Sequence, residues 1–172
     1  MIQFYDSTDI GLIPKTATHL AAYHDGRYAV SQTQIRNTLP SVTQVRWITI
    51  ANDPHSGIAD FEQYNPVFNV QGMLRAWCAG RHALGMSTPI VYTDRANARL
   101  ALERLDGLRA FYWITVIDPE NRGAQHQWTA DELAADLRDN WGAPIPASWI
   151  WACQWENTPG YDLSDLFLGW WA

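Results

Sequence analysis

The sequence predicts an α/β protein: a small, incomplete (β/α) barrel of the TIM type, formed by residues 1–172 as a single domain. Three observations support this class. Short apolar runs alternate with amphipathic segments, which indicates βα units around a mostly parallel sheet. There are seven or eight such runs, as a barrel requires, and 172 residues is below the usual barrel size. An open α/β sheet is the alternative.

The expected strands are rich in Val, Ile and aromatic residues without clean alternation, which is typical of strands buried on both faces. In order they are Ile2–Asp6, His19–His24, Arg46–Ala51, Gly57–Glu62, Pro89–Thr93, Phe111–Ile117 and Trp149–Trp155. The connection 52–56 is too short for a helix. Either an outer helix is missing there, or the two flanking runs form a local hairpin.

Four helices are expected between the strands, because capping residues precede apolar positions at helical spacing. Ser31 and Asp94 are candidate N-caps, and Thr129 begins a capping box with Glu132. The expected spans are Ser31–Leu39, Val67–Gly85, Asp94–Gly107 and Thr129–Gly142. The apolar stripe of the second helix consists of Val67, Val70, Leu74, Trp77 and Cys78.

Composition and charge exclude several classes of function. The net charge of −6 and the scattered Lys and Arg argue against a nucleic-acid partner. No apolar run reaches the roughly 18 residues needed for membrane insertion. The five histidines have no paired metal spacing, so neither a metal nor a cofactor is expected. Cys78 and Cys153 lie in apolar surroundings, which favours buried free thiols, although sequence leaves a disulfide between them open.

The segment Gly57–Glu62 carries the strongest chemical pattern. It is an apolar strand that ends in two carboxylates, Asp60 and Glu62. Side chains at i and i+2 of a strand share a face, which puts these two roughly 6.5 Å apart at Cα. Paired carboxylates are the groups that hydrolyse glycosidic bonds. Of the two, Glu62 is the better general acid, because a neighbouring carboxylate and aromatic walls raise its pKa, while Asp60 remains charged.

Other acidic and aromatic residues fall at or near the ends of the expected strands. In a parallel barrel, catalytic residues collect at the carboxyl ends of the strands. We therefore expect one acidic mouth rimmed by aromatic side chains, suited to a neutral, hydroxyl-rich ligand that reacts through a cationic transition state. Its expected members are Asp6, Tyr23, Asp25, Asp60, Glu62, Tyr92, Trp113, Trp155 and Asp162.

The order of these motifs resembles the family 25 glycoside hydrolases, the barrel lysozymes that cut peptidoglycan. It resembles still more closely the short glycoside-hydrolase-like domains of actinobacterial and actinophage proteins. The resemblance covers nearly the whole chain. It rests on Ile2–Asp6, Asp60-Phe61-Glu62, Pro89–Thr93, Tyr112-Trp113-Ile114, Gln154-Trp155 and Gly160–Leu163.

The resemblance implies a lysozyme-like or N-acetylmuramidase-like glycosidase whose partner is cell-wall carbohydrate. Its four acidic positions correspond to Asp6, Asp60, Glu62 and Asp162 as catalytic residues. The expected substrate-binding residues are Tyr23, Asp25, Tyr92, Trp113 and Trp155, although the core is the favoured place for Trp155.

The alternative is a catalytically inactive glycan-binding or structural module of a phage virion or cell surface, with phage structural proteins as partners. The sequence has ten tryptophans, and five of them, including Trp170 and Trp171, lie from Trp149 onwards. Aromatic side chains are enriched at protein interfaces, so this cluster favours such a role. The N-terminus lacks a basic region followed by an apolar one, so no signal peptide is expected. The expected location is the cytoplasm before release, or a phage particle.

Overall fold

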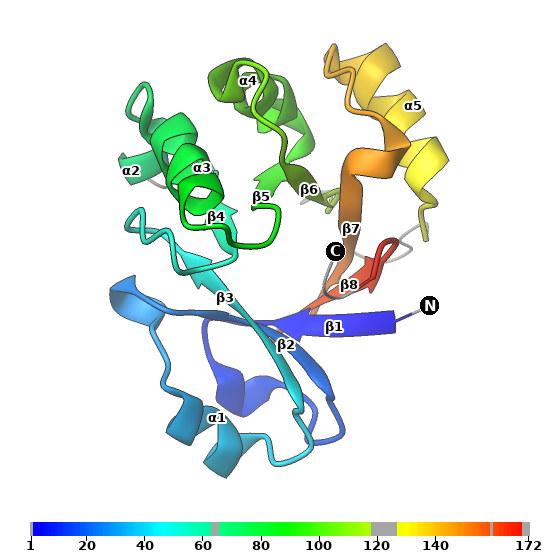
Figure 1. Ribbon diagram of the computed structural model, residues 1–172. Coiled ribbons are helices and arrows are strands. Elements are labelled where there is room, and N and C mark those ends of the chain that lie inside the picture. Colours follow the sequence, from blue (N-terminus) through cyan, green and yellow to red (C-terminus); the bar gives the residue numbers. More distant parts are fainter. Residues whose placement is uncertain (1, 63–65, 118–126, 159, 170–172) are drawn as a thin grey trace.

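A computed structural model describes residues 2–62, 66–117, 127–158 and 160–169 and shows a mixed α/β protein built on a closed barrel (Figure 1). Its eight strands pair in chain order, and β8 closes the ring against β1. The open sheet is therefore excluded. The strands are β1 (Ile2–Asp6), β2 (His19–Tyr23), β3 (Gln44–Thr49), β4 (Ile58–Asp60), β5 (Ile90–Asp94), β6 (Phe111–Thr115), β7 (Ile150–Asn157) and β8 (Asp162–Leu166).

The closing strand was not predicted. Consecutive strands from β1 to β7 pair in parallel, whereas β8 is antiparallel to both β7 and β1. Asp162 is the first residue of β8 and pairs with Asp6. The barrel therefore joins the two ends of the described chain along one ladder.

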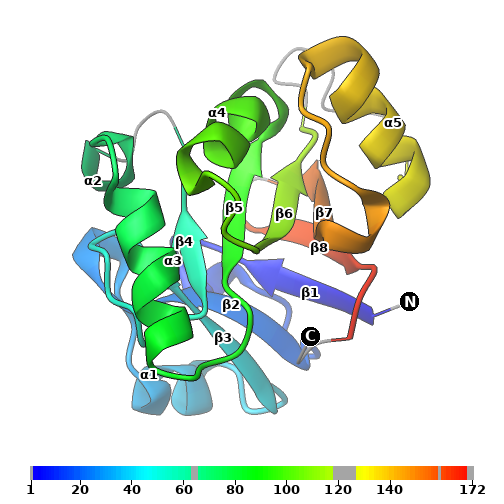
Figure 2. The same ribbon diagram turned by 45° about the horizontal axis from the view of Figure 1, so that its top comes forward.

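The helices lie outside the strands, with α3, α4 and α5 side by side along one part of the barrel and α1 on another (Figure 1, Figure 2). Capping fixes where three of them begin, as predicted: Ser31 and Thr129 form capping boxes, and the Asp94 side chain accepts from Asn97 N. The α-helices are α1 (Gln32–Thr38), α2 (Pro66–Asn69), α3 (Met73–Ala83), α4 (Arg95–Leu105) and α5 (Ala130–Trp141), and the 3₁₀ helices are η1 (Ile10–Leu12), η2 (Gly26–Tyr28) and η3 (Ala147–Trp149).

The predicted helix Val67–Gly85 is two helices. α2 ends at Asn69, and α3 begins after Gly72, which has a φ of 87°. A left-handed residue cannot continue a right-handed helix, so the chain breaks there. Val70 lies in the break with 57% of its surface exposed, so its place on the apolar stripe was wrong. Trp77 and Cys78 are buried on α3 as the pattern predicts.

The connection between β3 and β4, residues 50–57, contains no helix. The hairpin alternative is wrong, because β3 and β4 pair in parallel. Parallel neighbours normally need a crossover of about a dozen residues. Here a shorter loop suffices because Ile58, the first residue of β4, pairs with Ile48 near the end of β3. The chain therefore has little distance to travel back before it re-enters the sheet.

An aromatic core fills the barrel. The fully buried Trp113 ring lies 5.0 Å from Phe4, 4.4 Å from Tyr92 and 6.3 Å from Trp151, measured between centroids. The Trp113 indole N–H donates to Ser164 Oγ at 3.0 Å, which ties β6 to the closing strand. Smaller inward residues complete this layer: Ala21, Ile48, Ile58, Ile90 and Ala152. The core thus forms a floor beneath the carboxyl ends of the parallel strands.

Both cysteines are buried free thiols, as predicted. Cys78 and Cys153 belong to the apolar cluster between the sheet and helices α3 to α5. Within the described segments, no helix is long and apolar enough to cross a membrane.

Candidate active site

The polar site follows from the two-residue period of the strands. Along β1, Phe4 points into the barrel core, so Asp6 points the same way one step nearer the strand end. The same step leads from Ile58 to Asp60 on β4 and from Ile90 to Tyr92 on β5. Inward positions at or near the ends of these three strands are therefore polar, above an apolar floor.

These side chains surround a pocket of about 380 Å³ at the barrel mouth, which we call the acidic pocket. It brings together three of the four predicted catalytic acids, and two of the predicted substrate-binding residues, Tyr23 and Tyr92. The fourth acid, Asp60, adjoins it through Tyr23, whose hydroxyl donates to Asp60 Oδ2 at 3.3 Å. The lining consists of Asp6, Ser7, Thr8, Leu12, Tyr23, Glu62, Tyr92, Thr158, Gly160, Tyr161 and Asp162.

Asp6 and Asp162 face one another across the β1–β8 ladder. Like charges in directly opposed positions are destabilising. Asp6 is only 5% exposed, and its Oδ1 has no hydrogen-bond partner in the described part of the chain. Burial raises the pKa of Asp6 well above its ordinary value, and the charges of Asp162, Glu62 and Asp60 raise it further. Burial also raises the pKa of Asp162 to about 6.

The pKa values of Asp60 and Glu62 are both raised by burial. Burial raises the pKa of Asp60 to about 6, against the opposing effect of hydrogen bonds from Tyr23 and from the Glu62 backbone. Burial raises the pKa of Glu62 to about 7, and the charges of Asp60 and Asp94 add to this effect. Near neutral pH, Glu62 therefore carries a proton for much of the time while Asp60 is mostly ionised.

Gln154 on β7 links two sides of the pocket. Its Oε1 accepts the Tyr92 hydroxyl at 2.6 Å, and its side chain also hydrogen-bonds Asp162, which partly offsets the rise in that carboxyl's pKa. Gln154 is 1% exposed. It was not among the predicted site residues, although a buried amide inside an apolar strand was the available signal. Ser7 was also missed, and its hydroxyl donates to Gly160 O at 2.7 Å, which holds the rim.

Three predicted substrate-binding residues lie outside the acidic pocket. Asp25 accepts hydrogen bonds from Thr49 Oγ1 and from Ile50 N, the latter at 2.7 Å, and so joins the turn after β2 to the end of β3. Trp113 is buried in the barrel core. Trp155 packs against the cluster beneath α3 to α5, on the outer face of the sheet. Trp170 and Trp171 lie outside the described residues.

No Lys, Arg or His is among the described residues that line the acidic pocket. Its carboxyls therefore repel one another without a cation to offset them, and burial holds protons on them instead. In the described ranges, no three His, Cys, Asp or Glu side chains are placed to hold a metal ion. The arrangement can donate a proton from one carboxyl and stabilise a positive charge with another.

The crowded carboxyls predict that stability falls as pH rises. The pKa of Asp162 increases from 3.8 to about 6 on folding, and that of Glu62 from 4.5 to about 7. The folded protein holds these protons more tightly than the unfolded chain. This contribution to stability is therefore complete below about pH 4 and is lost as the pH rises through 6 to 7.

Urea unfolding of wild type and Asp6→Asn at pH 3.5, 6 and 7.5 measures this effect. The variant removes one member of the opposed Asp6–Asp162 pair without a change of shape. We expect it to be more stable than wild type at pH 7.5, by about 1 kcal/mol, and nearly equal at pH 3.5. A variant less stable than wild type at pH 7.5 would contradict this.

Comparison of the chain with protein families, with curated proteins and with solved structures gives no match. Function must therefore be inferred from the chemistry of the pocket itself.

Proposed function

We propose that this protein is a glycoside hydrolase that acts on peptidoglycan-type amino-sugar polymers. The observation that supports this most strongly is the pair Asp60 and Glu62, a buried carboxyl and a half-buried one two residues away, whose pKa values are raised to about 6 and about 7. Glycosidases need one protonated and one ionised carboxyl on either side of the scissile bond.

In this mechanism Glu62 is the general acid. It donates its proton to the glycosidic oxygen as the bond from that oxygen to the anomeric carbon breaks, and the leaving sugar departs as a neutral alcohol. Asp60 stays ionised and stabilises the positive charge that develops on the anomeric carbon and ring oxygen. Water then adds to the anomeric carbon, and its proton passes to the Glu62 carboxylate, which restores the starting state.

The remaining polar groups position substrate and water. Tyr23 donates to Asp60 and so fixes the orientation of the stabilising carboxylate. Asp6 and Asp162, with raised pKa values, can donate hydrogen bonds to sugar hydroxyls as well as accept them. Asp60 can also orient the substrate's own N-acetyl group for attack, a route that some glycosidases use.

We further propose that the barrel is a shortened variant of the TIM type. The seven parallel strands β1 to β7 support this, as do α-helices in the connections after β2, β4, β5 and β6. The variant differs from eight βα units in its antiparallel β8 and in the connections 7–18 and 50–57, which contain no α-helix. In such a barrel the carboxyl ends of the strands are the place for catalysis, and the acidic pocket occupies that end.

The pH dependence of hydrolysis tests the mechanism. We expect a bell-shaped profile for kcat/KM with its maximum between about pH 6 and pH 7, because the rate needs Asp60 ionised and Glu62 protonated. Release of reducing ends from purified bacterial cell walls, measured from pH 4 to pH 9, gives the profile. A rate that rises steadily through pH 9 would contradict Glu62 as the acid. Absence of release from any wall preparation would reject the hydrolase.

A second candidate is a saccharide-binding or structural module on the same barrel, for instance in a phage particle, without turnover. The observation that favours it is the departure from a complete barrel in the two connections without an α-helix and in β8. Saturable binding of cell-wall glycan at the acidic pocket, with no reducing ends released at any pH, would select this candidate.

A further inference from the structure

A second pocket, of about 600 Å³, lies between the start of α1 and the connection from β3 to β4. We call it the flank pocket, and its lining includes His24, Ala29, Val30, Trp47, Asp53 and Ser56. None of its lining residues also lines the acidic pocket. Its volume falls within the range of roughly 300–1,000 Å³ that is typical of small-molecule sites.

The flank pocket exists because the β3–β4 connection lacks a helix. Arg46 and Ile48 are buried on the inner face of β3, so Trp47 between them points outward. Trp47 packs against the outer cluster that includes Ile35 of α1, and His24 meets its ring edge-on, with centroids 5.8 Å apart. A helix in the 50–57 connection would cover this face, and in its absence the indole forms part of a pocket wall.

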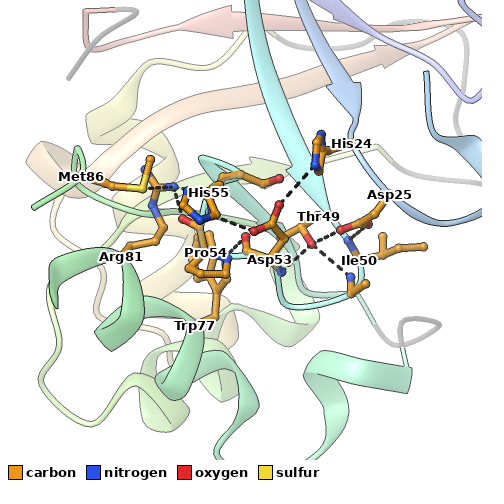
Figure 3. A network of polar contacts seen from close by, with 12 residues as sticks. His24, Asp25, Thr49, Ile50, Asp53, Pro54, His55, Trp77, Arg81 and Met86 are labelled. Carbon is orange, nitrogen blue, oxygen red and sulfur yellow. Dashed lines mark hydrogen bonds and ion pairs between the residues drawn. The ribbon is translucent and has the colours of Figure 1, made fainter. Parts of the chain in front are cut away.

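The polar wall of the pocket is held from several directions (Figure 3). His24 Nε2 lies 3.3 Å from Asp53 Oδ2, and Asp53 Oδ1 accepts the backbone N–H of His55 at 3.0 Å. Both carboxylate oxygens of Asp53 are therefore engaged and the side chain is fixed. Its carboxylate also has a histidine partner, whereas no Lys, Arg or His is among the described residues that line the acidic pocket.

Helix α3 fixes the backbone of the same loop. The Trp77 indole N–H donates to Asp53 O at 3.0 Å, and Arg81 donates to Pro54 O at 2.8 Å and to Ser56 O at 2.6 Å (Figure 3). Arg81 is 2% exposed, so these charge-assisted bonds are shielded from water. The loop is thus rigid before any ligand binds, which lowers the entropic cost of binding.

Ser56 supplies an independent indication of a ligand. It lines the flank pocket, is 1% exposed, and its hydroxyl has no hydrogen-bond partner in the described ranges. A buried hydroxyl without a partner is uncommon and costs stability. A ligand hydroxyl can both donate to and accept from this oxygen, and so satisfy it.

We propose that the flank pocket binds a neutral saccharide ring. One wall is apolar, with Val30 and the Trp47 indole against which the C–H face of a sugar can pack. The other wall presents Asp53, His24 and Ser56, which offer acceptors and donors to ring hydroxyls. Among the described residues the lining contains no Lys or Arg, so an anionic ligand would find no ammonium or guanidinium group there, and both oxygens of Asp53 are already engaged by His24 and by the His55 backbone.

Histidine resonances provide a site-specific readout. Of the described histidines, His24 and His55 line the flank pocket, whereas His19 and His82 lie elsewhere, and none of these four lines the acidic pocket. The full chain, labelled with ¹⁵N-histidine, is titrated with cellotriose and with tri-N-acetylchitotriose. We expect saturable shifts of the His24 and His55 signals, assigned with His24→Gln and His55→Gln, and unchanged His19 and His82 signals. Unchanged His24 and His55 signals with both sugars would overturn the proposal.

A pair of substitutions at one position supplies the control. Ala29 is an exposed lining residue, so Ala29→Trp occludes the pocket without disturbing the core, and Ala29→Ser leaves it open. We expect the occluding variant to weaken the affinity by roughly tenfold or more, and the serine variant to bind like wild type. Equal affinity of the two variants would overturn the proposal.

The flank pocket is independent of the proposed hydrolase function, and one variant separates the two. Glu62→Gln alters only the acidic pocket, so it should leave the sugar-induced shifts of His24 and His55 unchanged. If those shifts disappear in Glu62→Gln, the sugar occupies the acidic pocket and the flank proposal fails. Neither the flank-pocket proposal nor the hydrolase proposal predicts that Ala29→Trp loses cell-wall hydrolysis.

Discussion

Glu62→Gln is expected to reduce cell-wall hydrolysis by about 10²–10⁴-fold, while the protein stays folded. The amide has the shape of the carboxyl but cannot donate a proton to the leaving oxygen. Glu62 is at the surface of the acidic pocket and packs no apolar core, so the barrel should not depend on it. The loss should appear in kcat, with KM nearly unchanged, because the proton moves only in the transition state. Initial rates of reducing-end release measure both parameters.

A matched Glu→Gln change elsewhere is the control. Glu103 lies on the exposed face of α4, where it pairs with Arg99 at 2.8 Å, and it is not among the lining of the acidic pocket. Glu103→Gln should retain the wild-type rate. Comparable activity of Glu62→Gln and wild type, with both proteins folded by circular dichroism, would remove Glu62 from the mechanism and leave the saccharide-binding candidate.

Trp113→Ala is expected to destabilise the protein by about 3–5 kcal/mol. Trp113 is fully buried and contacts the rings of Phe4, Tyr92 and Trp151. Its truncation would leave a large cavity in the floor of the acidic pocket. It would also leave Ser164 Oγ without its indole donor on the closing strand. The free energy of unfolding, from urea titration at pH 6, measures the change.

A surface tryptophan calibrates this result. Trp141, at the end of α5, is 39% exposed, and the Arg95 guanidinium lies 5.5 Å from the centre of its ring. Trp141→Ala should cost no more than about 1 kcal/mol, the usual range of an exposed cation–π contact. If the two variants lose similar stability, the aromatic floor is not the main support of the barrel.

The parts of the fold that sequence predicted well are those fixed by local chemistry. Ser31 and Thr129 form capping boxes within four residues of chain, so the helix starts could be predicted without knowledge of the tertiary structure. The seven parallel strands are apolar because both faces are covered, and that composition is visible in sequence. The break at Gly72 was missed because the apolar spacing continues across it, and only the φ of 87° interrupts the helix.

β8 was missed for the opposite reason. Its inward residues near the mouth, Asp162 and Ser164, are polar because they contact the acidic pocket and the Trp113 indole. A strand whose inner face serves a polar site lacks the apolar pattern by which strands are recognised. The polar residues of the candidate site thus made the strand that closes the barrel hard to recognise from sequence.

The acidic pocket could be predicted in part because side chains alternate between the two faces of a strand, and this alternation does not depend on the rest of the fold. Asp6 and Tyr92 follow inward residues by two positions, so their direction was determined by the strand itself. Trp155 follows Gln154 at an irregularity in the β7–β8 register, and its outward direction depends on strand pairing that sequence does not display. The contact of Tyr161 and Thr158 with the pocket likewise depends on closure by β8.

The ladder that pairs Asp6 with Asp162 also determines when the pocket can form. These two residues come from opposite ends of the described chain, and contacts so distant in sequence carry a high loop-closure cost and form slowly. Docking of β8 is therefore expected to be a late event in folding, after β1 to β7 have paired. A partly synthesised chain would have its floor and helices but only one half of the acid pair. Chemistry at the mouth would begin only once β8 has joined β1.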